Sequence, residues 1–127
     1  SKKISDMQNR LLLMKENPDA VFVSIHLNKY TTSAAYGAQV FYSDNFEKSK
    51  DLAESIKQSI KDLLEPNNNR EIKKGTSSAY LLYNAHIPSV IVECGFLSNK
   101  QDLTMLKDDE FQNKMAFSIA KGILDFN

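Results

Sequence analysis

The chain has 127 residues, of which 42% are hydrophobic and 25% are charged. This length allows one domain with its own hydrophobic core and is too short for two ordinary domains. Sixteen basic side chains balance sixteen acidic ones, so no long-range field favours nucleic acid or an anionic membrane as a partner. No apolar run is long enough to span a bilayer, so no membrane span is expected. A single cysteine, Cys94, excludes an internal disulfide.

The first third of the chain predicts one helix followed by two strands. From Ile4 to Glu16 the apolar residues recur at helical spacing, and Asn17-Pro18 ends this segment. Val21–Ile25 is a short apolar run with β-branched residues, which favours a strand covered on both faces. Gly37–Tyr42 is the second predicted strand.

The middle of the chain predicts an amphipathic helix and a loop. Asp44, with Glu47 three residues later, has the form of a helix cap. Residues 65–78 are polar and contain few apolar anchors, which predicts a mobile surface loop. The inward stripe of the helix would consist of four aliphatic residues: Leu52, Ile56, Ile60 and Leu63.

The last third predicts a further strand and two helices. Ala79–Tyr83 fits either a short strand or a helical turn, and Ser89–Glu93 is a clearer strand. Ser98, with Gln101 three residues on, has the form of a capping box that opens a helix. Because strands alternate with helices, we expect an α/β fold, with a mostly parallel central sheet flanked by helices in a single domain. The last helix would bury one apolar face, formed by Phe111, Met115, Ile119, Ile123 and Phe126.

Two polar side chains follow the apolar strands directly. Val21–Ile25 runs into His26, and Val90–Val92 runs into Glu93. Ligands of open α/β sheets bind beyond the carboxyl ends of the strands, so two neighbouring parallel strands would bring both residues to one edge. A metal-binding imidazole and a carboxylate that takes a proton from metal-activated water would suit hydrolysis. By themselves the two residues also fit structural roles, as a hydrogen-bonded histidine and as a glutamate in an ion pair.

The words around these two residues resemble two signature segments of the zinc-dependent N-acetylmuramoyl-L-alanine amidases. The segments are Ser24-Ile25-His26-Leu27-Asn28 and Val92-Glu93-Cys94-Gly95-Phe96-Leu97-Ser98-Asn99. Arg10–Ala20 resembles the family's helix before the first segment, and Pro88 stands before the second as in the family. The similarity extends from about Met7 to Ile123 and is greatest to the sporulation-associated CwlD type.

The resemblance implies a metal, a substrate and three residue roles. It implies a zinc ion held by two histidines and a glutamate, and cleavage of the amide between the lactyl group of N-acetylmuramic acid and the L-alanine of the peptidoglycan stem peptide. His26 matches the second histidine ligand, and Glu93 matches the catalytic glutamate that moves a proton from the bound water to the leaving amine. Asn28, on the same side of its strand as His26, would contact substrate or orient a ligand. The expected place of action is extracytoplasmic, in the cell wall or spore cortex, with an activator or partner protein as a further expectation.

Part of the family pattern is missing from this chain. Family members begin with a strand ending in a Gly-His-Gly-Gly-type segment, followed by a ligand glutamate, and neither is present. His86 stands where the family has no ligand, which predicts a surface residue, and Tyr83 stands where relatives often carry a basic residue. We expect residues 1–127 to be the C-terminal major part of one amidase catalytic domain, with the remaining zinc ligands upstream of Ser1. Alone, the chain should bind zinc poorly and hydrolyse nothing, because catalytic zinc sites use three protein ligands.

Two other functions compete with the zinc amidase. A cysteine hydrolase would use Cys94 as nucleophile and His26 as base, but Cys94 follows Glu93 in an extended segment and should point the opposite way, as a buried thiol. A serine hydrolase lacks its Gly-x-Ser-x-Gly elbow. The main alternative is a non-catalytic cell-wall-binding domain of the same fold, in which tyrosines stack on sugars: Tyr30, Tyr36, Tyr42, Tyr80 and Tyr83.

Overall fold

The computed structural model describes residues 1–29, 32–76 and 79–126. Its central sheet has four strands in the order β1-β4-β2-β3. Strand β1 pairs with β4 and β2 with β3 in parallel, whereas β2 and β4 are antiparallel, so the predicted α/β fold with a mostly parallel sheet is confirmed. In chain order the elements are α1 (Lys2–Glu16), β1 (Phe22–Asn28), β2 (Gln39–Tyr42), α2 (Ser49–Leu63), β3 (Lys73–Lys74), α3 (Tyr80–Tyr83), β4 (Ser89–Phe96), α4 (Lys100–Leu106) and α5 (Asp109–Asp125).

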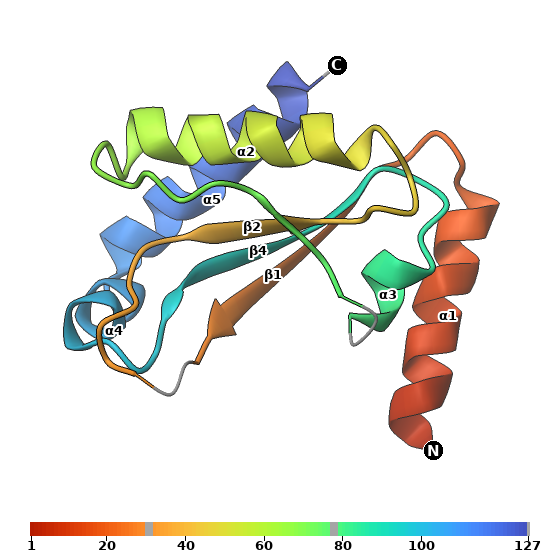
Figure 1. The fold of residues 1–127 in the computed structure, drawn as a ribbon, viewed down its shortest axis with the longest axis horizontal. Helices are drawn as coiled ribbons and strands as arrows, with labels where there is room; N and C mark the ends of the chain where they lie inside the picture. Colours follow the sequence, from red (N-terminus) through yellow and green to blue (C-terminus); the bar gives the residue numbers. More distant parts are fainter. Residues whose placement is uncertain (30–31, 77–78, 127) are drawn as a thin grey trace.

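Helices α2 and α5 cover one face of the sheet, while α1 and α3 lie together on the other side, at the end where β1 and β4 begin (Figure 1). The covering layer is closely packed: a Cβ added at Gly122 of α5 would lie 2.6 Å from the Cα of Ile56 on α2. Two serines of α2 donate hydrogen bonds to carbonyls of α5, Ser55 to Gly122 and Ser59 to Ser118. The sheet therefore has one closed face, and most of its opposite face has no helical layer.

The main hydrophobic core lies between the sheet and this helical layer. The predicted stripes supply it: Leu52, Ile56 and Ile60 of α2 are at most 2% exposed. Leu63, predicted as the fourth member of that stripe, is instead 46% exposed, and the core contact passes to Leu64. From α5 and the strands the core takes Phe111, Met115, Ile119, Val40, Val90, Val92 and Cys94.

A smaller apolar cluster joins α1 and α3 to the start of β1. It contains Met14, Leu81, Ala85 and Ile87, with Phe22 packed against it. The predicted helix over 4–16 is confirmed as α1, and Asn17 ends it by donating from its side chain to the carbonyl of Leu13. Ala79–Tyr83 adopts the helical alternative, as α3. This cluster builds a wall at one end of the uncovered face.

Two predicted helix caps are wrong by a few residues. Helix α2 begins at Ser49 after Lys48, and Asp44 forms an ion pair with Lys74 instead of a cap. Helix α4 is capped by Asn99, whose side chain accepts the backbone N–H of Asp102, so Ser98 is not the cap. Several Ser, Asp and Asn side chains near a helix start can serve as the acceptor, and the path of the preceding loop selects among them.

The segment 65–78, predicted as a mobile loop, is anchored in its described part. It contains β3, and the Asn68 side chain donates to the Ala38 carbonyl and to Glu65. Arg70 donates from Nε to the carbonyl of Tyr36. These polar anchors replace the apolar ones that the sequence lacks, and residues 77–78 lie outside the described residues.

Strand β1 is not covered on both faces as its apolar sequence predicts. Within the described residues it pairs with β4 alone and lies at the edge of the sheet. Its side chains Ile25 and Leu27 are 60% and 51% exposed. An apolar run records a preference for burial, but the cover must come from elements that the described part of this chain does not contain.

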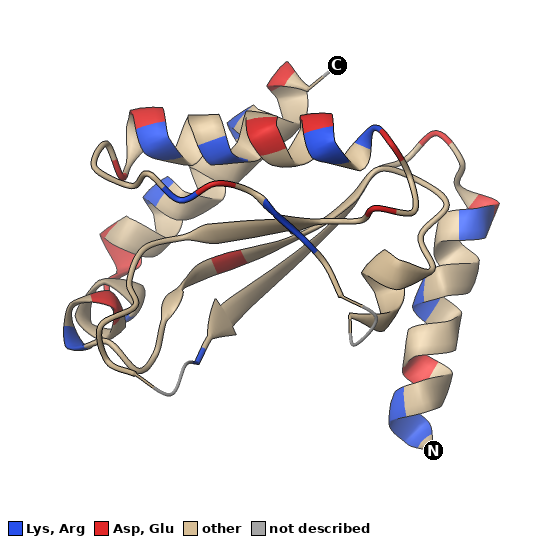
Figure 2. Cartoon of the chain, viewed as in Figure 1, with Lys and Arg blue, Asp and Glu red and all other residues tan. Residues whose placement is uncertain are grey.

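The charges of the molecule are spread over its helices. Figure 2 shows acidic and basic positions interspersed along α1, α2 and α5, with an acidic position inside β4. The exposed ion pairs include Arg10–Asp6 on α1 and Lys114–Glu110 on α5, each four residues apart. Among the described helices none is long and apolar enough to cross a membrane.

Candidate active site

The register of three strands places His26 beside Glu93. In the parallel pair β1–β4, His26 stands opposite Glu93, and in the antiparallel pair β2–β4, Gln39 stands opposite Glu93 from the other side. Residues directly opposite one another in a sheet project to the same face, with Cβ atoms about 5 Å apart. The prediction that His26 and Glu93 meet at one place on the sheet is confirmed. We call His26, Glu93 and Gln39 the reactive row.

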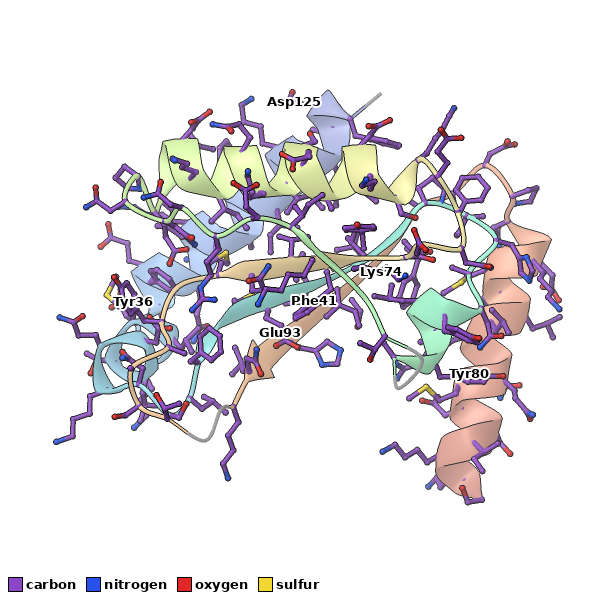
Figure 3. The ribbon with its side chains drawn as sticks, viewed as in Figure 1. Tyr36, Phe41, Lys74, Tyr80, Glu93 and Asp125 are labelled. Carbon is purple, nitrogen blue, oxygen red and sulfur yellow. The ribbon has the colours of Figure 1, made fainter. Side chains whose placement is uncertain are left out.

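The reactive row lies on the uncovered face. Val92 and Cys94, the neighbours of Glu93 on β4, are buried in the main core, so alternation along the strand turns Glu93 the other way. Figure 3 shows Glu93 on the side of the sheet away from α2 and α5. Strand β4 continues to Phe96 and β1 to Asn28, so the two polar residues lie inside their strands and not beyond the ends, as predicted.

The carboxyl group of Glu93 is poorly satisfied. Its Oε2 atom is buried and, among the described residues, has no hydrogen-bond partner. Burial raises the pKa of Glu93 above its ordinary value, and the nearby imidazole of His26 lowers it in part. A buried polar atom without a partner is uncommon and marks a place where a cation, water or substrate group completes the structure.

The imidazole of His26 is exposed but oriented. Its Nε2 atom lies 2.7 Å from the hydroxyl oxygen of Ser24, two residues earlier on the same side of β1. This hydrogen bond occupies one ring nitrogen and leaves the other available to a further partner. Ser24 was not among the predicted site residues, although its place two residues before His26 could have indicated it.

Asn28 lies one step further along the same face, past a bulge. The pair His26–Glu93 is followed by Asn28–Phe96, so β4 has one more residue than β1 in this interval. Asp102 stabilises the bulge because its Oδ2 accepts the backbone N–H groups of Phe96 (2.9 Å) and Gly37 (2.8 Å). The bulge brings Phe96 level with Asn28, beside the reactive row.

Gln39 and Arg70 belong to the surroundings of the row, and sequence patterns did not reveal them. Gln39 is 3% exposed, and its Nε2 donates to the carbonyl of Glu71 at 2.7 Å. The guanidinium of Arg70 lies 4.8 Å from the centre of the Phe96 ring. Both positions depend on how β2 and the segment after α2 fold back onto β4, and no local pattern encodes that.

Cys94 is placed against a catalytic role. It is 6% exposed, in the main core, and faces away from Glu93. Burial, and then the charges of Glu93 and Glu65, raise the pKa of its thiol to about 11. A nucleophilic cysteine needs a thiolate near an imidazole, so the structure confirms the predicted buried thiol and removes the basis for a cysteine hydrolase.

The remaining predicted residues lie away from the row. His86 is exposed and borders a groove with Tyr83 and Lys15, which agrees with its prediction as a surface residue. Tyr42 packs against the main core. Tyr36 and Tyr83 are 64% and 61% exposed, and Tyr80 is 39% exposed. Tyr30, the fifth tyrosine of the sugar-binding alternative, lies outside the described residues.

The family model of the N-acetylmuramoyl-L-alanine amidases matches residues 1–125. The chain belongs to this family. It is 34% identical over 125 residues to the germination-specific N-acetylmuramoyl-L-alanine amidase of Bacillus subtilis, a match that covers 98% of this chain and 52% of that protein. The chain thus spans about half the length of this curated relative.

Solved structures give the same family and fold. The CwlD amidase from Clostridioides difficile, solved in complex with the GerS lipoprotein, matches with a TM-score of 0.89 and 39% identity over 98% of this chain and 63% of that one. The amidase AmiC2 of Nostoc punctiforme matches with a TM-score of 0.83 and 32% identity, covering 94% of this chain and 64% of that one.

The amidase chain carries only part of a metal site in its described residues. No group of three or more His, Cys, Asp or Glu side chains that could hold a metal ion occurs there. An exposed imidazole and a carboxyl group with an unpartnered oxygen do fit a zinc site as one ligand and one base. They are too few to hold the ion without further ligands.

Proposed function

We propose that this chain is the C-terminal major part of the catalytic domain of a zinc-dependent peptidoglycan amidase. The enzyme would cleave the amide between N-acetylmuramic acid and the L-alanine of the stem peptide. The observation that carries the proposal is the in-register pair of His26 and Glu93 on the uncovered face, with a buried and unpartnered oxygen on Glu93. Membership of the amidase family supports the reaction.

His26 would be one zinc ligand, and the other ligands would come from chain upstream of Ser1. When bound, zinc would supply Lewis acidity at the scissile carbonyl and acidify a water molecule. The hydrogen bond from Ser24 holds the imidazole by one nitrogen, as a carboxylate or carbonyl does for many ligand histidines.

Glu93 would act as the general base and then as the general acid. Its carboxylate would take a proton from the attacking water and deliver it to the nitrogen of the departing alanine. The burial that raises its pKa suits this exchange, because a base whose pKa lies nearer to neutrality can both take and return the proton. Asn28, beside the row beyond the bulge, would contact substrate.

The exposed edge of the sheet supports the view that the domain is larger than this chain. Strand β1 pairs on one side only within the described residues. Ile25 and Leu27 line an apolar hollow of about 230 Å³, together with Cys94 and Phe111. Additional chain of the same domain would pair with β1, fill this hollow and bring the missing ligands to His26.

A comparison of the chain with the complete domain tests the proposal. In isothermal titration, residues 1–127 should show no sub-micromolar zinc binding, whereas the complete domain should bind zinc tightly. Mass spectrometry of muropeptide digests should show cleavage between muramic acid and alanine by the complete domain. Glu93→Gln should lower kcat by roughly 10²–10⁴-fold. Tight zinc binding by the chain alone would mean that its ligands have been misassigned.

The same digest separates catalysis from wall binding. Activity that survives Glu93→Gln would remove Glu93 from the base role. Binding to peptidoglycan without cleavage by the wild-type domain would favour the non-catalytic alternative, in which the exposed Tyr36 and Tyr83 meet sugars.

We propose that the enzyme acts outside the cytoplasm, in the cell wall or spore-cortex space, and that a partner protein regulates it. The similarity to a germination-specific amidase supports the spore cortex as the place of action. The similarity to an amidase solved in complex with a lipoprotein supports a protein partner. Localisation of a fluorescent fusion in sporulating cells would test the place of action.

A further inference from the structure

Next to the reactive row, the uncovered face carries a second row of different character. On β4, Ile91 precedes Glu93 by two residues, and its partners are Ser24 on β1 and Phe41 on β2. Residues two apart on a strand are about 7 Å apart. Ile91 and Phe41 therefore form an apolar pair one step from the candidate base, which we call the platform.

The platform belongs to neither hydrophobic core. Ile91 and Phe41 are both partly exposed, and neither is among the side chains packed in or against the two described clusters. Figure 3 labels Phe41 on β2, beside the strand that carries Glu93. An apolar cross-strand pair on a face with little other cover keeps contact area for an outside group.

The polar groups around the platform are already engaged. The hydroxyl of Ser24 is hydrogen-bonded to His26 at 2.7 Å. The Nε2 of Gln39 donates to the carbonyls of Val40 (3.3 Å) and Glu71 (2.7 Å), both main-chain groups. A group placed on the platform therefore meets carbon, and specificity there must come from apolar contact.

The proposed substrate has an apolar group at the matching place. Its scissile amide nitrogen is bonded to the Cα of L-alanine, which bears a methyl group. Most other groups nearby are polar, such as sugar hydroxyls, amides and the next peptide unit. We propose that the platform of Phe41 and Ile91 receives the methyl group of the stem-peptide alanine, and thereby selects alanine over glycine at the first stem position. This inference rests on the proposed function.

Paired substrates test the platform directly. The complete amidase domain would be given N-acetylmuramoyl peptides with either L-alanine or glycine at the first position, and kcat/KM would be measured for each. One methyl group in an apolar pocket discriminates by roughly 10–200-fold, and on this open platform we expect about tenfold. The ratio is taken within each variant, so a general loss of activity cancels.

Matched substitutions separate apolar contact from shape. Ile91→Thr and Ile91→Val have nearly the same shape and suit a strand, but only threonine places a hydroxyl on the platform. Ile91→Thr and Phe41→Ala should bring the alanine-to-glycine ratio close to one, whereas Ile91→Val and Phe41→Leu should keep most of it. Phe117→Ala, at a 65% exposed position on α5, is the control that should leave the ratio unchanged.

The outcomes distinguish the two proposals. A ratio that falls in Ile91→Thr but persists in Ile91→Val supports the platform. A wild-type domain that cleaves both substrates, with a ratio that no platform variant changes, overturns the platform and leaves the amidase function intact. A folded, zinc-loaded wild-type domain that cleaves neither substrate overturns the amidase function itself, and the platform with it.

Discussion

The two faces of the sheet use the same strands for different purposes. On the closed face, Val90 and Val92 of β4 lie at 0% exposure beneath α2 and α5. On the uncovered face, Ile91 and Glu93 of the same strand remain partly exposed, and Glu93 keeps an oxygen without a partner within the described chain. Alternation along one strand therefore separates the groups that stabilise the fold from those proposed to do chemistry. The closed face should govern stability, and the uncovered face should govern activity at little cost in stability.

The closed face should show the largest effect on stability. Leu52, at 0% exposure on α2, packs in the main core, so Leu52→Ala should reduce the free energy of unfolding by about 2–5 kcal/mol. Leu12→Ala is the matched control, because Leu12 is 52% exposed on α1 and should cost less than about 1 kcal/mol. Urea unfolding followed by circular dichroism would measure both. Equal costs would contradict the assignment of the core to the closed face.

The buried thiol gives the closed face a smaller, pH-dependent signature. The pKa of Cys94 is about 11 in the folded protein, above its ordinary value of 9.0, so the folded state holds the proton that the unfolded state releases. Its contribution to stability is complete below pH 9 and is lost as the pH rises from 9 to 11, by about 1–2 kcal/mol. Comparison of unfolding free energies with Cys94→Ala across this range isolates it. The native thiol should also react slowly with iodoacetamide at pH 7.5, and rapid labelling would contradict its burial.

The smallest expected stability effect is a gain from the uncovered face. Burial raises the pKa of Glu93, so its ionised form is disfavoured in the folded protein and reduces stability above the ordinary carboxyl pKa. In metal-free protein, Glu93→Gln should therefore raise the melting temperature by a few degrees at pH 7 and by less at pH 4. Differential scanning calorimetry with a chelator would measure this. A loss of stability at pH 7 would show that Glu93 serves the fold rather than the chemistry.

The local patterns in the sequence determined the elements and the facing of their side chains. Period-3.6 stripes predicted α2 and α5, and alternation after Val92 turned Glu93 and Cys94 to opposite faces. The two short signature segments identified the family before any coordinates. Each of these inferences needs only residues that are close together in the chain.

The tertiary structure alone decided which side chains surround the candidate base. It placed β4 between β1 and β2, set Gln39 opposite Glu93 and Phe41 opposite Ile91, and introduced the bulge that Asp102 stabilises. It also left the apolar strand β1 at an edge, where its sequence predicts cover on both faces. Strand order and register are set by packing between segments tens of residues apart, because the same alternating strand can pair with several neighbours at similar local cost. Periodicity within one segment fixes which way a side chain points, and long-range packing fixes what it meets.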